Sequence, residues 1–302
     1  MKISSQQHVG VHGISFVVVL VVPQRTQVAI VEADQCLGME NTLHAFMAHL
    51  VLIFEECRRV LKPTGNCWVN MGDSYASTGG GYDENGSRGS TSKAVSPKTQ
   101  ASVVKGKNRV PPEGLKTKDL IGQPWRVAFA LQASGWYLRQ DNIWHKPNPM
   151  PESVRDRATK AHEYVFHLTK SGKYYFDSAV WAEEAVKGAA GSSFNKGKPA
   201  THQLGRSSDA KRAETGTRNR RSVWTVATVP YAEAHYATYP PKLITPPLLA
   251  STPLNGIVLD PFGGSGTTAQ VALAHGRRAV LIERGPQNII LIRKRLNLTL
   301  SP

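Results

Sequence analysis

Three glycines follow a short apolar stretch near the C-terminal end of this 302-residue sequence. The segment reads Ile257-Val-Leu-Asp-Pro-Phe-Gly-Gly-Ser-Gly-Thr-Thr268. Glycines let the backbone turn tightly and approach a ligand without a Cβ in the way. Free N–H groups at the start of a helix favour a carboxylate or another anion. Glu283 lies 23 residues after Asp260, and an acid at about this spacing suits the two hydroxyls of a ribose. The segment therefore predicts a small-molecule pocket.

Three other interpretations of these glycines compete with this one. A phosphate-binding P-loop requires Gly-Lys-Ser/Thr, whereas Gly266 is followed by two threonines. A dinucleotide fingerprint requires Gly-x-Gly-x-x-Gly, and the spacing here differs. A purely structural glycine turn is the third interpretation, and the joint occurrence of loop, helix and distal Glu283 argues against it.

The loop needs elements to hold it, and the flanking pattern predicts a strand, a helix and a second strand of the doubly wound α/β type. Upstream, apolar spacing and Pro or Gly boundaries predict further helices and strands. The predicted helices are 42–61, 121–131, 241–252 and 267–275, and the predicted strands are 14–22, 66–71, 136–144, 163–169, 173–176, 256–259 and 279–282.

Positive charge is concentrated in two polar stretches. Residues 78–118 hold eight Lys or Arg against three acids, and residues 187–221 hold nine against two, within a net charge of +15. Both stretches are rich in Gly and polar residues, so we expect flexible insertions. Such an excess favours a polyanionic partner, because each neutralised phosphate releases condensed counterions. Solubilising loops without a partner are the alternative.

The three cysteines, Cys36, Cys57 and Cys67, neither pair evenly nor show metal-ligand spacing. A reduced, cytoplasmic setting without a metal site is therefore expected. The apolar run Ile14–Val22 is about half the ~18 residues that span a bilayer, which favours a buried strand over a membrane segment.

The glycine segment resembles the S-adenosylmethionine motif of bacterial and phage DNA methylases that modify exocyclic amino groups, N4 of cytosine or N6 of adenine. The order is similar to that of their permuted members, with catalytic and target-recognition parts first and the cofactor motif last. The resemblance covers about residues 37–296 and includes four further segments: Phe54–Gly65 with Asn70–Tyr75; Asp119–Trp125; Gly135–Arg139 through Asn142–Ser153 to His162–Tyr164; and Ser222–Trp224 with Ala234–Pro240.

This resemblance implies roles for particular residues on the cofactor side. It implies that the methionine end of S-adenosylmethionine is lined by Asp260, Phe262, Gly263, Gly264, Gly266 and Thr267. Glu283 would hold the ribose, and Thr238 would touch the amino-acid moiety.

On the substrate side, the resemblance implies a loop near the target base that contains Lys146, Asn148 and Pro149. A rigid loop with an incidental charge is the alternative. Asp73 follows a strand beside the expected cleft, where a turn-forming Asp is the competing interpretation. For His162 and Glu163, a structural role at the start of a strand is favoured.

The sequence departs from the family at one motif. These enzymes resemble one another most in a tetrapeptide, Asp/Asn/Ser-Pro-Pro-aromatic, which holds the flipped base so that its amino nitrogen faces the methyl group. The strand Val17–Val22 runs instead into Pro23-Gln-Arg-Thr26, with no second Pro and no aromatic. We therefore assign no catalytic residue, and we expect a divergent or scrambled segment at 1–36 before a methyltransferase domain at 37–302.

The resemblance implies a Rossmann-like α/β fold with a mostly parallel sheet flanked by helices. The leading function is site-specific methyl transfer from S-adenosylmethionine to an amino group of cytosine or adenine in double-stranded DNA, with a cognate restriction nuclease as a further partner. The alternative is a catalytically impaired remnant that binds DNA and cofactor. Methylation of a small molecule or a protein is disfavoured by the two basic stretches.

Overall fold

The computed structural model describes residues 42–76, 114–185, 216–229 and 239–297, together with Leu37, Glu40, Pro112 and the backbone of Leu20–Val21. Most of the segment 1–36 and most of both basic stretches, 78–118 and 187–221, lie outside the described residues, as does Thr238. The predicted boundaries of these parts therefore stay predictions.

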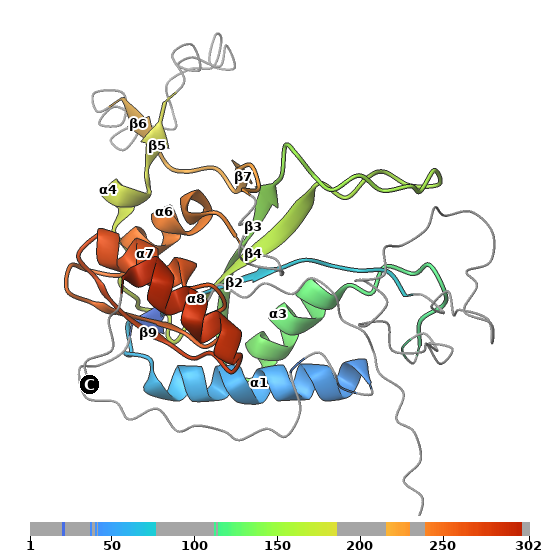
Figure 1. The fold of residues 1–302 in the computed structure, drawn as a ribbon, viewed down its shortest axis with the longest axis horizontal. Helices are drawn as coiled ribbons and strands as arrows, with labels where there is room; N and C mark the ends of the chain where they lie inside the picture. Colours follow the sequence, from blue (N-terminus) through green and yellow to red (C-terminus); the bar gives the residue numbers. More distant parts are fainter. Residues whose placement is uncertain are drawn as a thin grey trace, which may run out of the picture.

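Helices and strands are interspersed along the chain (Figure 1). In order they are β1 (Leu20–Val21), α1 (Leu43–Val60), β2 (Asn66–Met71), α3 (Gln123–Ala133), β3 (Tyr137–His145), β4 (His162–Thr169), α4 (Ser178–Trp181), β5 (Glu183–Glu184), β6 (Thr217–Arg218), β7 (Val223–Thr225), α6 (Pro241–Ser251), β8 (Ile257–Asp260), α7 (Thr267–Ala274), β9 (Arg278–Leu281) and α8 (Pro286–Leu296). Strand β3 is followed by β4, and three short strands follow α4.

The strands form a mixed sheet in two main parts, with strand orders β2-β4-β3-β7 and β1-β8-β9. The short strand β1 also lies beside β2. The predicted α/β class is confirmed, but parallel pairing holds only for β3 with β7 and β8 with β9 among the described pairs. Antiparallel pairing is more frequent than predicted because β4 runs back between β2 and β3, and β1 runs against β8.

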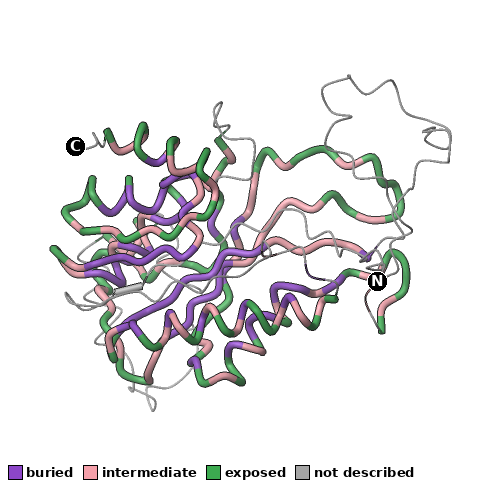
Figure 2. Tube along the Cα trace, turned by 60° about the horizontal axis from the view of Figure 1, so that its bottom comes forward, coloured by how far each residue is buried: buried purple, intermediate pink, exposed green. Residues whose placement is uncertain are grey.

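Two apolar cores lie on opposite faces of the sheet. On one face, Phe46, Leu50 and Phe54 of α1 pack with residues of α3 and with Val69 of β2, and α1 and α3 lie side by side at the bottom of Figure 1. Helices α6 and α7 cover the other face, where Trp68 packs with further tryptophans from β3, α4 and β7. Alternate residues of β2 supply both cores because strand side chains point alternately to the two faces. Figure 2 accordingly shows buried backbone along the central strands.

The direction of α6 shows which strand ends share an edge. Tyr239, just before α6, hydrogen-bonds to Asp260 at the carboxyl end of β8. At the other end of α6, Ser251 accepts a hydrogen bond of 2.8 Å from Trp68, in the first half of β2. Strands β2 and β3 run in one direction because both are antiparallel to β4. The carboxyl ends of β2, β3 and β8 therefore lie at one edge of the sheet.

Most predicted elements are confirmed within a residue or two of their ends. The strand predicted at 173–176 is wrong: this segment is irregular, because Tyr175 N–H donates to Thr64 instead of joining a ladder. Helix α8 was not predicted. No helix among the described residues is long and apolar enough to cross a membrane.

Cys57 and Cys67 are both buried and unpaired, whereas Cys36 lies outside the described residues. In the described part of the chain, no group of His, Cys, Asp or Glu could hold a metal ion.

Candidate functional site

The carboxylate of Asp260 organises the glycine loop at the end of β8. It is fully buried and accepts hydrogen bonds from the Phe262 N–H at 2.9 Å, the Thr268 hydroxyl at 2.5 Å and the Tyr239 hydroxyl at 3.4 Å. Burial raises the pKa of Asp260 to about 6, although these hydrogen bonds act in the opposite direction. Asp260 thus holds both ends of the glycine loop, because it bonds to Phe262 before the glycines and to Thr268 after them.

The loop requires glycine at specific positions. Gly264 and Gly266 have φ angles of +50° and +82°, a region that side chains with a Cβ rarely adopt. A Cβ on Gly263 would lie 3.1 Å from Leu281 Cβ and 3.3 Å from the Ile282 carbonyl oxygen, because the loop packs against the end of β9. The backbone of residues 262–266 therefore forms a tight turn directly before helix α7, and we call this turn the glycine cradle.

Glu283 lies at this cradle, as its spacing predicts. One of its carboxylate oxygens accepts the Gly264 N–H at 2.7 Å, and the other accepts the Gly285 N–H at 2.7 Å and the Asn288 amide at 3.2 Å. The acid is therefore fixed against the glycine loop.

Two further side chains complete the cofactor edge, and the sequence did not single them out. Arg295 of α8 donates to the hydroxyls of Ser265 and Thr267 at 3.1 and 2.5 Å, which holds the start of α7. Tyr239 anchors the Ala-Thr-Tyr-Pro segment to the loop through Asp260 and Thr268. Its neighbour Thr238 lies outside the described residues, so its predicted cofactor contact stays a prediction.

Asp73 follows β2 at the same edge of the sheet, and its carboxylate caps helix α3. It accepts the N–H groups of Gly122 and Gln123, both at 3.1 Å, and that of Ser74 at 2.9 Å. Gly122, the residue before α3, has no side chain that could cap the helix. Asp73, which lies 49 positions earlier in the sequence, supplies this cap instead.

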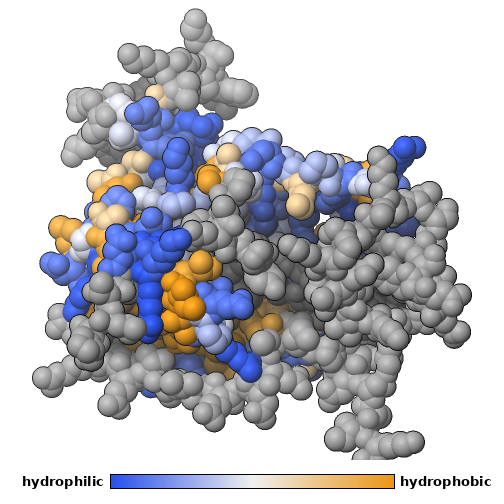
Figure 3. Space-filling view, in the orientation of Figure 1, coloured by the Kyte–Doolittle hydropathy of each residue, from blue (hydrophilic) through white to orange (hydrophobic). Residues whose placement is uncertain are grey.

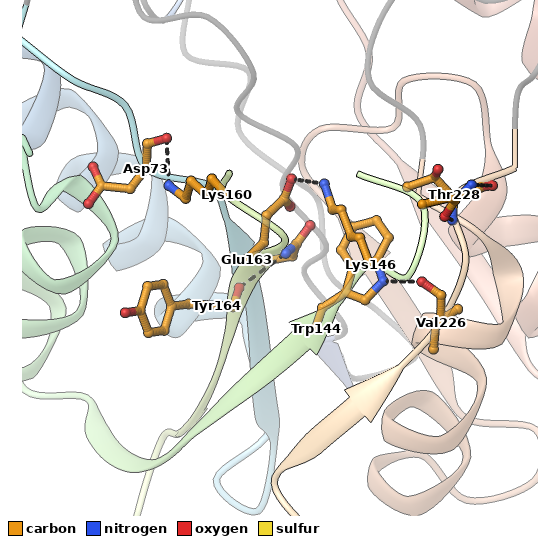
Figure 4. Close-up of polar contacts among 10 residues, drawn as sticks. Asp73, Trp144, Lys146, Lys160, Glu163, Tyr164, Val226 and Thr228 are labelled. Atoms are coloured by element: carbon orange, nitrogen blue, oxygen red, sulfur yellow. Dashed lines mark hydrogen bonds and ion pairs between the residues drawn. The ribbon is translucent and has the colours of Figure 1, made fainter. Parts of the chain in front are cut away.

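Lys146 and Glu163 form an ion pair across the ends of β3 and β4 (Figure 4). The Lys146 ammonium also lies 4.3 Å from the centre of the Trp144 ring, and this indole donates to the Val226 carbonyl oxygen at 2.7 Å. Lys160 donates to the Asp73 carbonyl oxygen at 2.7 Å. Figure 4 shows these groups in a row along the strand ends.

Asn148 joins this row to the segment after β7. Its amide donates to the Thr228 carbonyl oxygen at 3.1 Å, and its own oxygen accepts the Thr228 N–H at 3.0 Å. These two hydrogen bonds give Asn148 a structural role, because they hold the segment after β3 against the segment after β7. Of the predicted substrate-side residues, the structure therefore brings Asp73, Lys146 and Asn148 to one edge, and Pro149 follows Asn148 in the chain.

Three buried acceptor oxygens near this row have no hydrogen-bond partner: Asn70 Oδ1, Asn142 Oδ1 and Glu163 Oε2. Asn70 and Asn142 flank Val165 on neighbouring strands, and their amide nitrogens donate to β4 carbonyl oxygens, each at 3.0 Å. A buried acceptor without a donor is costly. Each carboxylate oxygen of Asp260 and Glu283 accepts at least one hydrogen bond, whereas these three oxygens near the polar row accept none from the described residues.

In the space-filling view, the described residues are mainly hydrophilic in the upper part of this face, and an apolar patch lies lower on the same view (Figure 3).

A family model described as DNA methylase, for the N6/N4 methyltransferases, matches residues 30–294. The chain belongs to this DNA methylase family. The sequence is 44% identical over 264 residues to the type II methyltransferase M.Cfr9I of Citrobacter freundii, covering 87% of this chain and 75% of that protein. It is 41% identical over 261 residues to M.SmaI of Serratia marcescens, covering 86% and 77%.

Solved structures show the same fold. The PvuII DNA methyltransferase, named as cytosine-N4-specific, matches with a TM-score of 0.55 and 15% identity over 96% of this chain and 81% of that one. A DNA modification methylase of Thermus thermophilus, solved with S-adenosyl-L-methionine, matches with a TM-score of 0.50 and 18% identity over 96% and 87%. The predicted family and fold are thereby confirmed.

S-adenosylmethionine is the cofactor of this family, and the glycine cradle fits it. In the cradle, a Cβ at Gly263 would lie only 3.1 Å from Leu281 Cβ, and an acid lies 2.7 Å from the Gly264 N–H. When bound, the cofactor supplies an electrophilic methyl group. The DNA methylase is therefore an S-adenosylmethionine-dependent enzyme of the type II class.

Proposed function

We propose that this DNA methylase transfers the methyl group to N4 of cytosine at a specific site in double-stranded DNA. The observation that carries the proposal is the shared edge: the cradle after β8 and the polar row after β2 and β3 lie at the same ends of the strands. Cytosine is taken from the specificity in the name of the PvuII enzyme, whose fold the chain shares. Adenine N6 is the alternative that the experiment separates.

On the cofactor side, the residues of this chain bind S-adenosylmethionine and orient it. The loop residues Phe262, Gly263, Gly264, Gly266 and Thr267 line the methionine end, with Asp260 beneath them and Thr238 beside the amino-acid moiety. Glu283 holds the ribose hydroxyls. Its contact with the Gly264 N–H supports this role, because it places the carboxylate beside the loop.

On the DNA side, the residues of the polar row form a wall for the flipped base. Lys146 and Asn148 set the position of the loop that follows β3 through their contacts with Glu163 and Thr228. Asp73 holds α3 against the same edge.

The two basic stretches are proposed to contact DNA phosphates. The described end of the second stretch, residues 216–221, instead makes contacts within the protein. Arg218 and Arg221 both bond to Glu183 at 3.0 Å. Arg220 lies over the Trp181 ring and donates to the Trp181 carbonyl oxygen. Phosphate contacts are therefore expected from the part of 187–221 that precedes Gly216.

The test is tritiated methyl transfer from S-adenosylmethionine to unmethylated genomic DNA. Digestion to nucleosides and mass spectrometry then separates N4-methylcytosine from N6-methyladenine, and sequencing of the modified DNA maps the site. We expect N4-methylcytosine at one short sequence. Label in adenine would overturn the choice of base, and label in protein alone would overturn DNA as the substrate.

A second candidate function is binding of DNA and cofactor with little or no transfer. It is favoured by the direction of β1, because Leu20 lies opposite Leu259 and Val21 opposite Val258 in an antiparallel pair. The carboxyl end of β1 thus points away from the edge with the glycine loop. DNA binding without label in the assay above would support this candidate.

A cognate restriction nuclease is a further proposed partner, supported by the type II relatives. Its test is protection: DNA modified by this chain should resist a nuclease that cuts the mapped site, and unmodified DNA should not.

A further inference from the structure

The connection between β3 and β4, residues 146–161, extends well beyond the sheet (Figure 1). We call it the β3–β4 loop. It leaves from the edge that carries the polar row, and Figure 2 shows most of it as exposed or half-buried.

Met150 is the most exposed large apolar side chain among the described residues, with 87% of its surface accessible. It stands between Pro149 and Pro151. Each proline fixes its own φ angle and restricts the residue before it, so the backbone around Met150 has few conformations. An unbranched, polarizable side chain on a stiffened backbone is suited to entering an apolar gap.

The root of the β3–β4 loop is anchored to neighbouring segments. Lys160 donates to the Asp73 carbonyl oxygen at 2.7 Å, and the Arg157 guanidinium lies 3.9 Å from the centre of the Tyr75 ring. Asp156 pairs with Lys118 at 2.9 Å. These contacts hold the 156–160 side of the loop, and the pair of Asn148 with Thr228 holds the other side two residues before Met150.

The charge beside Met150 favours a polyanion as the partner. Arg155 is exposed and makes no ion pair with any described residue. Over residues 146–161, four Lys or Arg stand against two acids. An exposed apolar residue in a loop that also carries an exposed arginine five positions further on fits DNA better than an apolar protein surface, because the arginine can pair with phosphate.

We propose that Met150 enters the DNA duplex as a wedge and fills the space left by the flipped target base. Apolar side chains, methionine included, insert between base steps in several DNA-binding proteins and unstack them. This inference rests on the proposed function, since it requires that a base is extruded from duplex DNA. Met150 would act as a positioning residue because it touches the duplex and not the reacting atoms.

The experiment measures DNA affinity, which needs no methyl transfer. A short duplex is first selected from a random pool for binding to the wild-type chain in the presence of S-adenosylhomocysteine. An abasic site is then placed opposite each base of the selected sequence in turn. The position where this change strengthens binding marks the flipped base, because extrusion costs least for an unpaired base.

Met150→Ala is expected to weaken binding to the paired duplex about tenfold and to leave binding to the abasic-opposed duplex within about twofold, since only the paired duplex needs opening. Met150→Leu should restore wild-type affinity. The matched control is Leu254→Ala, which removes an apolar side chain that is 69% exposed in the turn before the amino end of β8, and it should change neither affinity.

Equal weakening on both duplexes would overturn the wedge and leave a simple contact, and no weakening on either would exclude contact. If no abasic position strengthens binding, no base is extruded and the inference is wrong. Failure of the proposed function has a different signature, because it appears as absent label in the methyl-transfer assay while these affinities remain measurable.

Discussion

The cofactor edge and the target edge of this DNA methylase are built in different ways. At the cofactor edge, Asp260 bonds to residues two and eight positions further along the chain, and Glu283 reaches Gly264 from 19 positions away. At the target edge, Asp73 caps a helix 49 positions away, and Asn148 pairs with Thr228 across 80 positions.

The two edges differ also in how completely their polar groups are paired. The carboxylates of Asp260 and Glu283 accept several hydrogen bonds within their own loops. Around the target edge, Asn70, Asn142 and Glu163 each keep a buried oxygen that has no donor among the described residues. The strand–loop–helix–strand unit around Asp260 supplies most of the cofactor edge, and Tyr239 and Arg295 join it from outside that unit, whereas the proposed target edge depends on contacts across the whole sheet.

The largest effect should come from supplying the motif that the target edge lacks. Replacing residues 1–36 with a family-like strand ending in Ser-Pro-Pro-Tyr should raise methyl transfer at least ~100-fold, because alignment of reacting groups contributes ~7–11 kcal/mol. Tritium transfer to unmethylated genomic DNA measures the gain. The control chimera carries four alanines in place of the tetrapeptide. Equally strong transfer by the original chain would contradict this expectation and direct attention to Pro23 and Asp73.

The cofactor edge can be disrupted by a substitution that leaves the target edge unchanged. Gly264→Asp should weaken S-adenosylmethionine binding by about 100-fold, because φ of +50° strains a residue with a Cβ and the new carboxylate lies beside Glu283. Calorimetry measures the affinity. Gly172→Asp is the control, since its Cβ would meet only the Tyr137 ring at 3.8 Å. Unchanged affinity in Gly264→Asp would remove the glycine loop from the cofactor site.

The contrast also explains what the sequence predicts well. The Asp260 loop and Glu283 were predicted correctly as neighbours because one strand–loop–helix–strand unit brings them together. The pairing of Lys146 with Glu163 was not predicted, because it depends on the register of β3 and β4. Arg295 was missed since nothing in its local pattern distinguishes a helix-face arginine that reaches Thr267 from a solvated one.

The burial of Asp260 predicts a pH dependence of stability. Its pKa is about 6 in the folded protein against 3.8 for the ordinary carboxyl, so the folded state binds the proton more tightly. The free energy of unfolding should therefore fall as pH rises from 3.8 to about 6. Between about pH 4.5 and about pH 7.5 this amounts to roughly 2 kcal/mol.

Denaturant unfolding of the wild type and of Asp260→Asn at those two pH values measures the difference. The amide does not titrate, so the wild type should lose roughly 2 kcal/mol more than the variant on going to the higher pH. Parallel pH profiles would show that Asp260 keeps an ordinary pKa and that its burial is compensated within the loop.

The smallest effect concerns Asp73 and tests whether the target edge is held by long-range contacts. Asp73→Ala removes the acceptor of the Gly122 and Gln123 N–H groups, and loss of a helix cap costs about 1–2 kcal/mol of unfolding free energy. Asp156→Ala is the matched control, because its pair with Lys118 is exposed and exposed pairs of this kind contribute little to stability. S-adenosylmethionine affinity should stay unchanged in both variants, since neither residue contacts the glycine loop.

If Asp73→Ala weakened cofactor binding as strongly as it weakened folding, the two edges would be energetically coupled. The separation between a local cofactor unit and a sheet-dependent target edge would then be wrong.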